Sequence, residues 1–338
     1  MTAGSEGPSA VISRRTFLVR STAGAGAATL VLPVTRRAGA VEEPIAETAF
    51  GKIRGVAVGR VNAFKGVPYG ASTAGRGRFM PPKPPEPWPG VRTAQDWAGR
   101  APQWPTFGYM LLYGEGAPED RRQRRELAAL AGAPDNLSPS EDCLTLNVWT
   151  RGLGAKRPVM IWYHGSGFHY GSANSPRLDG TNLAAHHDVV VVTINHRLNA
   201  LGHLYLADLA GSAFAESGNA GTLDMLASLQ WVRENIERFG GDPGNVTIFG
   251  QSGGGAKVST LLAMPAARGL FHRAIVMSGA TIRLTDQERA AKLAEAVLAE
   301  LGISRNQVEK LQEIPFERLQ HFPLNLNRGN RGFPKPLR

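Results

Sequence analysis

Continuous apolar runs and alternating runs follow one another through the middle of the chain. "LTLNVWT" (Leu144–Thr150) alternates, whereas "PVMIWY" (Pro158–Tyr163) and "VVVVTI" (Val189–Ile194) are continuous. Continuous runs of this length are typical of strands buried on both faces of a mostly parallel sheet. Two later runs, "NVTIFG" (Asn245–Gly250) and "RAIVMSG" (Arg273–Gly279), predict further strands.

Helical spacing separates these predicted strands. Apolar residues recur every three or four positions over residues 222–239, and Gly240 supplies a stop; they are Leu223, Leu226, Leu229, Val232, Ile236 and Phe239. A short helix over residues 254–264 ends before Pro265. A third helix opens with Thr285 and Glu288 spaced as a capping box and closes at Gly302. Strands that alternate with helices predict an α/β fold with crossover connections.

The first part of the chain has a different pattern. Residues 50–70 read as short antiparallel strands with glycine-marked turns. Residues 71–140 form a long irregular stretch rich in proline and aromatic residues. So long a loop is either functional or disordered. Its aromatic side chains either form a wall over an apolar pocket or belong to an ordinary satellite core; they are Trp88, Trp97, Trp104, Phe107, Tyr109 and Tyr113.

The N-terminus resembles an export signal. "SRRTFLVR" (Ser13–Arg20) pairs two arginines before Phe17 and Leu18, and a mild apolar stretch of small residues follows. "AGA" (Ala38–Ala40) then offers the small-x-small pattern that a signal peptidase accepts. We expect residues 1–40 to be a twin-arginine signal peptide that engages the twin-arginine export machinery, which would place the protein in the periplasm or outside the cell. The alternative is a basic disordered tail.

Charge and composition exclude several classes of protein. The formal net charge is +10, but residues 1–40 hold five arginines and one glutamate, which leaves about +6 for the rest. Basic runs of this kind are usually solvated faces, so we expect no nucleic-acid partner. No run of 18 apolar residues is present, so we expect no stable membrane insertion. The single cysteine, Cys143, cannot form an intramolecular disulfide and is predicted to be a buried structural thiol rather than a nucleophile.

One serine lies between a β-branched apolar run and a cluster of glycines. In "NVTIFGQSGGG", Gly250, Ser252 and Gly254 fit the pattern G-x-S-x-G. The pattern alone is weak, but the strand it needs precedes it and the helix it needs follows it. The bend forces an unfavourable backbone angle on the serine, and glycine neighbours avoid clashes across it. The sequence therefore predicts Ser252 as an exposed nucleophile; the alternative is a strand that ends in a flexible turn.

A serine nucleophile generates an oxyanion, which needs donors that are already in place. Gly253 follows Ser252 directly and supplies one backbone N–H. "HGSGF" (His164–Phe168) comes straight after a predicted strand, and its small residues allow a substrate to approach the backbone. Ser166 and Gly167 are therefore predicted to supply the other N–H groups of an oxyanion hole, against the alternative of an ordinary glycine turn.

These motifs together resemble the type B carboxylesterases, the α/β-hydrolases related to cholinesterases. "SEDCLTLNVWT", "YHGSGF", "LFHRAIVMSG" and above all residues 218–254 carry the resemblance, which extends over residues 46–282. It implies an α/β-hydrolase fold, with a mixed, mostly parallel sheet and flanking helices. It also implies hydrolysis of carboxylic esters through an acyl-serine on Ser252. No metal-ligand spacing appears in the sequence, so we expect no metal, and we expect no cofactor. The expected domains are an esterase domain over residues 41–325 and an irregular basic tail over residues 326–338.

The sequence departs from the family at several positions. Ser166 stands where the family usually has glycine, Gly253 where it more often has alanine, and Gln251 where it often has glutamate. Cys143 lacks the upstream partner that it often has in the family. A side chain at Ser166 is expected to narrow the acyl site, while every backbone N–H is retained.

The larger departure is the lack of a recognisable catalytic base and acid. In this fold they follow the serine in the order acid, then histidine. Only His272 and His321 follow Ser252; the first matches the family as framework and the second lies in a predicted loop. The six earlier histidines are not assigned as base either; they are His164, His169, His186, His187, His196 and His203. We therefore expect a C-terminally truncated or frameshifted product that lacks the last strands and helices and leaves an exposed sheet edge.

Three hypotheses follow. The first is an exported carboxylesterase acting on small-molecule esters, of which this chain is a poorly active part. The second is a non-catalytic esterase-like binding protein or a decayed gene product. The third is an α/β domain with a coincidental serine turn. The acyl and alcohol groups of the substrate are not specified by the sequence.

Overall fold

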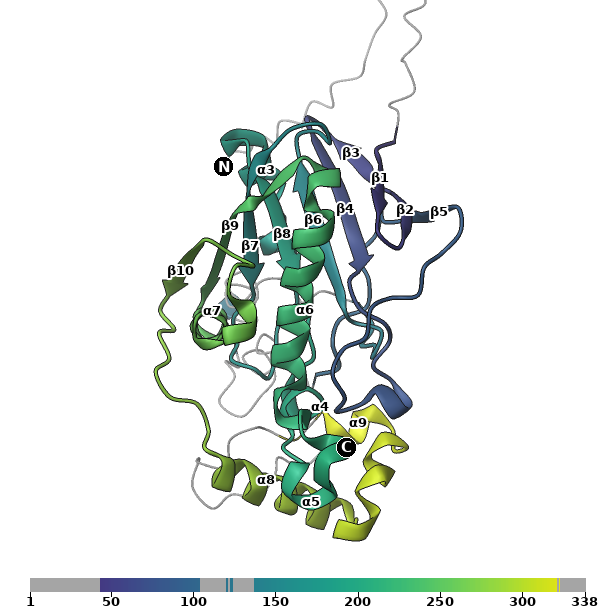
Figure 1. The fold of residues 1–338 in the computed structure, drawn as a ribbon, viewed down its shortest axis with the longest axis vertical. Coiled ribbons are helices and arrows are strands. Elements are labelled where there is room, and N and C mark those ends of the chain that lie inside the picture. The colour runs from purple at the N-terminus through teal and green to yellow at the C-terminus, as the bar shows by residue number, and fades with distance from the viewer. Residues whose placement is uncertain (1–42, 104–119, 121, 124–136, 321, 323–338) are drawn as a thin grey trace, which may run out of the picture. The chain divides into compact units, whose positions relative to one another are not determined.

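A mixed seven-stranded sheet forms the centre of the described chain (Figure 1). The computed structural model describes residues 43–103, 120, 122–123, 137–320 and 322, all within one compact unit, Val41–Arg338. The strand order is β10-β9-β7-β8-β6-β4-β3. The strands are β3 (Val56–Val58), β4 (Val61–Pro68), β6 (Thr145–Thr150), β7 (Arg157–Tyr163), β8 (Val190–Ile194), β9 (Gly241–Gln251) and β10 (Arg273–Met277).

The sheet has a parallel part and an antiparallel part. Strands β10, β9, β7 and β8 pair in parallel, and β8, β6, β4 and β3 pair in antiparallel. The continuous apolar runs therefore form parallel strands, as predicted, and the hairpin β3–β4 confirms the short antiparallel strands. Strands β1 (Ile45–Thr48), β2 (Gly51–Arg54) and β5 (Val91–Thr93) form a separate small sheet. In the described part of the chain, β10 lies at an unpaired edge of the larger sheet.

Alternate residues of the central strands pack on opposite faces of the sheet. Val148 and Val192 belong to the largest apolar cluster, together with residues of helices α6 (Ala220–Asn235) and α7 (Gly253–Ala263). The neighbouring residues Trp149 and Val191 pack with Ala184 of helix α3 (Thr181–His187). Helices thus cover both faces, which confirms the α/β prediction. Helix α6 runs along the sheet in Figure 1 and continues as the 3₁₀ segment η5 (Ile236–Phe239), which ends at Gly240 with φ 74°.

A second apolar cluster lies among short helices at one end of the sheet (Figure 1). We call it the helical cluster; its helices are α4 (Asn199–His203), α5 (Ala207–Ala210), α8 (Gln287–Leu301), η7 (Arg305–Gln312) and α9 (Phe316–Leu319). Further 3₁₀ turns are η1 (Gly75–Gly77), η2 (Pro176–Leu178), η3 (Gly211–Phe214), η4 (Ser217–Asn219) and η6 (Pro265–Ala267).

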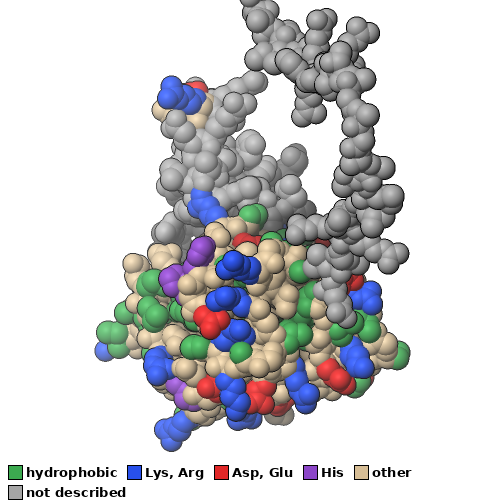
Figure 2. Space-filling view, turned by 90° about the horizontal axis from the view of Figure 1, so that it is seen from above, with side chains coloured by type: hydrophobic (Ala, Val, Ile, Leu, Met, Phe, Trp, Pro, Cys, Tyr) green, Lys and Arg blue, Asp and Glu red, His purple; other side chains and the backbone are tan. Residues whose placement is uncertain are grey.

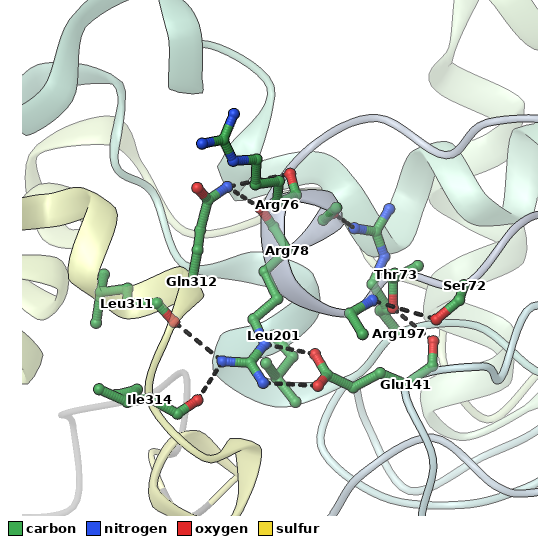
Figure 3. A network of polar contacts seen from close by, with 12 residues as sticks. Ser72, Thr73, Arg76, Arg78, Glu141, Arg197, Leu201, Leu311, Gln312 and Ile314 are labelled. Carbon is green, nitrogen blue, oxygen red and sulfur yellow. Dashed lines mark hydrogen bonds and ion pairs between the residues drawn. The ribbon is translucent and has the colours of Figure 1, made fainter.

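Arg78 forms a buried ion pair and also joins the helical cluster to an earlier part of the chain. The Arg78 guanidinium donates two hydrogen bonds of 2.6 Å to the Glu141 carboxylate (Figure 3). Its third nitrogen donates to the backbone carbonyls of Leu311 and Ile314 at the end of η7. The Gln312 amide donates to the Arg78 carbonyl oxygen at 3.1 Å. A guanidinium whose nitrogens are all hydrogen-bonded can be buried. Here the Arg78 guanidinium also anchors the segment around Leu311, which is more than 200 residues away in sequence.

Some sequence expectations need correction or lie outside the described residues. Helix α8 is capped by Asp286, whose carboxylate accepts from the Arg289 N–H at 2.9 Å, so the capping box expected at Thr285 was placed one residue early. The prediction that α8 ends at Gly302 is confirmed, with φ 67°.

Trp88 and Trp97 pack against apolar clusters, while the aromatic residues at positions 104, 107, 109 and 113 lie outside the described residues. Cys143 is fully buried, as predicted, and burial raises the pKa of its thiol.

The surface mixes charges. On the face in Figure 2, Lys and Arg side chains are interspersed with acidic and apolar ones. Asp188, for example, accepts from Arg157 at 2.7 Å and lies 3.6 Å from Arg151. Such exposed pairs contribute little to stability. Within the described ranges, no helix is both long enough and apolar enough to cross a bilayer.

Candidate active site

Ser252 lies on a sharp turn between the end of β9 and the start of α7. Its φ of 57° and ψ of −122° are unfavourable for a residue with a side chain. The Ser252 N–H donates to the Met277 carbonyl oxygen of β10 at 2.8 Å, which holds the turn against the neighbouring strand. The side chain is exposed at the N-terminus of α7. The predicted strand, turn and helix are thus all present around this serine.

Glycines around the turn allow a close backbone approach. A Cβ on Gly254 would lie 2.1 Å from the Tyr163 carbonyl oxygen, and one on Gly279 would lie 1.9 Å from the Ser252 carbonyl oxygen. A Cβ on Gly250 would lie 2.5 Å from the Gly254 backbone. Real Cβ atoms do not approach backbone oxygens so closely, so larger residues would displace the turn. Gly250 and Gly254 have a steric role here in addition to matching a sequence pattern.

Strand pairing brings a second segment to the turn. Tyr163, the last residue of β7, pairs with Gly250 of β9. The segment that follows β7, residues 164–170, therefore lies beside Ser252; we call it the 164–170 loop. A Cβ on Gly253 would lie 2.1 Å from the Gly167 nitrogen, so the two backbones are in direct contact. The structure thus brings together the predicted residues Ser252, Gly253 and Gly167, with Ser166 adjacent in the loop.

The 164–170 loop exposes backbone N–H groups near the serine. Ser166 and Gly167 both have positive φ, 67° and 64°. Among the described residues, neither N–H has a protein acceptor. The Gly253 N–H is in the first turn of α7, where helix N–H groups lack intrahelical partners. Unpaired N–H groups beside a helix N-terminus favour negative charge, so this arrangement can stabilise an oxyanion formed next to the Ser252 Oγ.

No histidine described in the structure is hydrogen-bonded to Ser252. His272 begins the β10 segment, and its Nδ1 accepts from the Val246 N–H at 3.1 Å. Val246 precedes Ser252 by six residues on the same strand, which is roughly 20 Å at the rise of a β-strand. His272 is therefore a framework residue, and position 321 lies outside the described residues. His186 and His187 end helix α3 on the other face of the sheet.

Three other histidines and one lysine are buried close to the 164–170 loop. His164 and His196 stack with ring centroids 5.0 Å apart, and His203 packs edge-on against Phe168. Burial, together with the nearby Lys257, lowers the pKa of all three imidazoles, that of His203 to about 3. Their Nε2 atoms are buried and have no hydrogen-bond partner among the described residues. Neutral imidazoles are consistent with this burial.

The sequence analysis missed Lys257. Its side chain is fully buried in α7, and burial lowers the pKa of its amine well below the ordinary value. Helical spacing could have indicated this position, because Lys257 lies four residues after Gly253 and four before the buried Leu261. A lysine on the buried face of a short apolar helix is unusual.

The described residues offer no metal site. No group of three or more potential ligands among them could hold a metal ion. A cavity of about 130 Å³ lies beside α6, lined by residues that include Phe50, Tyr69, Trp231 and Glu234. It contains none of the four predicted site residues.

Comparison with known proteins identifies the family. The model of the carboxylesterase family matches residues 42–331, so the chain belongs to that family. The fold is that of the α/β-hydrolases, as solved carboxylesterase structures show. A carboxylesterase of Geobacillus stearothermophilus superposes with a TM-score of 0.72 at 41% identity, over 86% of this chain and 55% of that one.

Curated relatives are esterases of bacteria and animals. The chain is 42% identical to the para-nitrobenzyl esterase of Bacillus subtilis over 278 residues, 81% of this chain and 51% of the relative. It is 40% identical to human carboxylesterase 3 over 259 residues, 74% of this chain and 42% of the relative. The chain thus spans about half the length of the curated relatives it matches.

Proposed function

We propose that the chain carries the nucleophile and the oxyanion hole of a serine carboxylesterase that acts on small-molecule esters. The observation that carries the proposal is the contact between the Ser252 turn and the 164–170 loop, where the Gly167 nitrogen packs against Gly253. The names of the relatives support ester hydrolysis. The esterase unit extends over residues 41–325 in this proposal, followed by a basic tail over residues 326–338.

The proposed reaction proceeds through an acyl-serine. The Ser252 Oγ bonds to the ester carbonyl carbon while its proton passes to a base, and the carbonyl oxygen becomes an oxyanion. The N–H groups of Ser166, Gly167 and Gly253 stabilise that charge. The alkoxy oxygen then leaves, taking a proton, as the alcohol. Water hydrolyses the acyl-serine, which releases the carboxylic acid and restores the hydroxyl group.

The described residues supply no base for the first step. The Ser252 side chain makes no capping hydrogen bond, and the one described histidine that follows it, His272, lies at the other end of β9. A serine without its base loses several orders of magnitude in turnover and keeps only oxyanion and binding effects. We therefore expect this chain alone to hydrolyse esters poorly. The same observation favours a second candidate function, that of a non-catalytic esterase-like binding protein.

Covalent labelling tests the proposed function. The purified chain is incubated with a fluorophosphonate, and the modified residue is identified by mass spectrometry. Labelling confined to Ser252 and abolished by Ser252→Ala, but not by Ser259→Ala, supports the proposal. Because the described residues supply no base, labelling is followed for hours at high probe concentration, where the oxyanion hole alone still accelerates the reaction. A folded chain whose Ser252 reacts no faster than other exposed serines refutes the proposal and favours the binding protein. Rapid hydrolysis of p-nitrophenyl butyrate that disappears in Ser252→Ala would contradict the expected lack of a base.

We further propose that residues 1–40 direct export. The paired arginines Arg14 and Arg15, the apolar stretch and the Ala38–Ala40 cleavage pattern support this. A reporter that is active only after twin-arginine export is fused after residue 45. We expect activity with the natural sequence and none after Arg14→Lys and Arg15→Lys together. Activity that the double variant retains would contradict twin-arginine export.

A further inference from the structure

Lys257 is buried without a carboxylate partner. Its exposed fraction is 0%, and no acidic side chain lies within ion-pairing distance of it among the residues that the structure describes. Burying an amine is costly unless its hydrogens are well bonded. An apolar side chain would fill the same space on α7 without that cost. The contacts of this lysine therefore need an explanation other than packing.

Among the residues that the structure describes, the Lys257 Nζ makes its polar contacts with one residue at the start of the 164–170 loop. Nζ donates to the His164 carbonyl oxygen at 2.8 Å and lies 3.4 Å from the His164 Nδ1. It also lies 5.8 Å from the centroid of the Phe168 ring, within the reach of a cation–π contact. All of these partners belong to the same loop. Lys257 itself is on α7, five residues after Ser252.

Within the loop, the Tyr170 N–H donates to the Ser166 carbonyl oxygen at 3.4 Å. Further hydrogen bonds come from other parts of the chain. The Asn199 N–H of helix α4 donates to the Phe168 carbonyl oxygen at 2.8 Å. Just beyond the loop, Gln103 exchanges two hydrogen bonds of 2.9 Å with the Gly171 backbone. Neither Asn199 nor Gln103 belongs to the Ser252 turn or to α7. Among these bonds, that of Lys257 alone links the loop to the helix that begins at Gly253.

We propose that Lys257 is a positioning residue that fixes the 164–170 loop relative to Ser252 through the His164 carbonyl group. The proposal rests on the proposed function, because that loop carries the oxyanion donors Ser166 and Gly167. The peptide plane held by Lys257 lies two residues before Ser166. Lys257 fixes the loop at its first residue, His164, and the contact of Gly167 with Gly253 fixes it again three residues later. Together these two contacts determine where the N–H groups of Ser166 and Gly167 lie relative to Ser252. Lys257 touches neither substrate nor Ser252 in this mechanism.

The test compares Lys257→Met with Val258→Ala. Methionine has nearly the volume of lysine but cannot donate to the His164 carbonyl. Val258 is also fully buried in α7 but packs in the apolar core, so its truncation controls for general loosening of the helix. Two quantities are measured on the full chain. They are the fluorophosphonate labelling of Ser252, resolved into binding and chemical steps, and hydrogen exchange in peptides covering residues 164–171. In these peptides the Tyr170 and Gly171 N–H groups are hydrogen-bonded and report on the loop.

We expect Lys257→Met to slow the chemical step of labelling by about tenfold or more, since loss of one oxyanion donor costs about 10²–10³. Reversible binding of the phosphonate should be unchanged, because only the attack uses the oxyanion donors. Exchange in the 164–171 peptides should be about tenfold faster. Val258→Ala should change neither quantity while lowering the unfolding midpoint.

The two readouts separate this proposal from the proposed function. If Ser252 is not labelled even in the natural chain, the proposed function fails, and the exchange data alone decide the role of Lys257. Exchange of residues 164–171 that is unaltered in Lys257→Met overturns the positioning role in either case. Equal effects of Lys257→Met and Val258→Ala also overturn it, because they would show only a general loosening of α7.

Discussion

Two basic side chains are buried near the carboxyl ends of the central strands, and their surroundings differ. Arg197 has a 2% exposed side chain and donates to both oxygens of Asp224, at 2.8 and 2.6 Å. It also donates to the backbone oxygens of Met80 and Ala220. Lys257 is as deeply buried, but within the described part of the chain it has one strong hydrogen bond, to the His164 carbonyl, and no carboxylate partner.

The difference shows what each burial achieves. The Arg197 guanidinium is fully compensated, so it can stay charged and join α6 to the segment around Met80. The Lys257 amine is undercompensated, and its pKa is lowered by burial. The buried charge of Arg197 holds secondary-structure elements together. In our proposal, the burial of Lys257 costs free energy of folding but positions one peptide group, that of His164. Four predictions test this contrast, from the largest effect to the smallest.

Asp224→Asn should be the most damaging change. It leaves the buried Arg197 charge with neutral partners only, the new amide and backbone carbonyls such as that of Met80. Removing the charged partner of a buried pair typically costs about 3–5 kcal/mol of unfolding free energy. Urea denaturation followed by circular dichroism measures the loss. Asp142→Asn, at an exposed position, is the matched control and should leave the midpoint unchanged. A loss below about 1 kcal/mol for Asp224→Asn would show that the pair contributes little.

Acid should destabilise the Lys257 region through its imidazoles. The folded pKa of His203 is about 3, below the ordinary 6.5, so the native state binds fewer protons than the unfolded state. Stability from this group is fully present above pH 6.5 and is lost as the pH falls toward 3, by at most about 1.4 kcal/mol per pH unit. Between pH 6.5 and 4 the unfolding free energy should decline less steeply in His203→Leu than in the natural chain. The difference in slope should correspond to the uptake of about one proton fewer on unfolding. An unchanged slope would contradict the buried neutral imidazole.

Glu141→Gln should have an intermediate effect. Arg78 loses a charged partner but keeps the carbonyl groups of Leu311 and Ile314. The pair is slightly exposed, 7% and 9%, so we expect a loss of about 1.5–3 kcal/mol. Hydrogen exchange should rise in η7 and α9 and remain unchanged in β7 and β9. Faster exchange throughout the sheet would show that the helical cluster is not a separately anchored unit.

Lys257→Met should have the smallest effect on stability. The variant loses one hydrogen bond but removes the penalty of a buried amine, so we expect a change within about 1 kcal/mol. Thermal unfolding by calorimetry measures it. If Lys257→Met were as unstable as Asp224→Asn, the proposed difference between Lys257 and Arg197 would be wrong. In that case the lysine would be a stabilising element like Arg197.

Much of the fold could be predicted because local patterns are strong. The apolar runs correspond to β7, β8, β9 and β10, and the helical spacing to α6, α7 and α8. The cap of α8 was one residue off, since Thr285 and Asp286 are both good caps and only the backbone geometry selects Asp286. For the candidate site, the pattern around Ser252 identified the turn. The buried Lys257 was missed, because a lysine in a short helix ordinarily faces solvent.

The sequence by itself determined the succession of strands and helices along the chain, the family motifs and the glycine-flanked turn at Ser252. These features depend on residues that are close neighbours in sequence. Tertiary structure decided which distant groups meet. The pairing of Tyr163 with Gly250 sets Gly167 against Gly253. Lys257 reaches a carbonyl 93 residues earlier, and Arg197 meets Asp224 across 27 residues. Such contacts depend on strand register and helix packing, which no local pattern encodes.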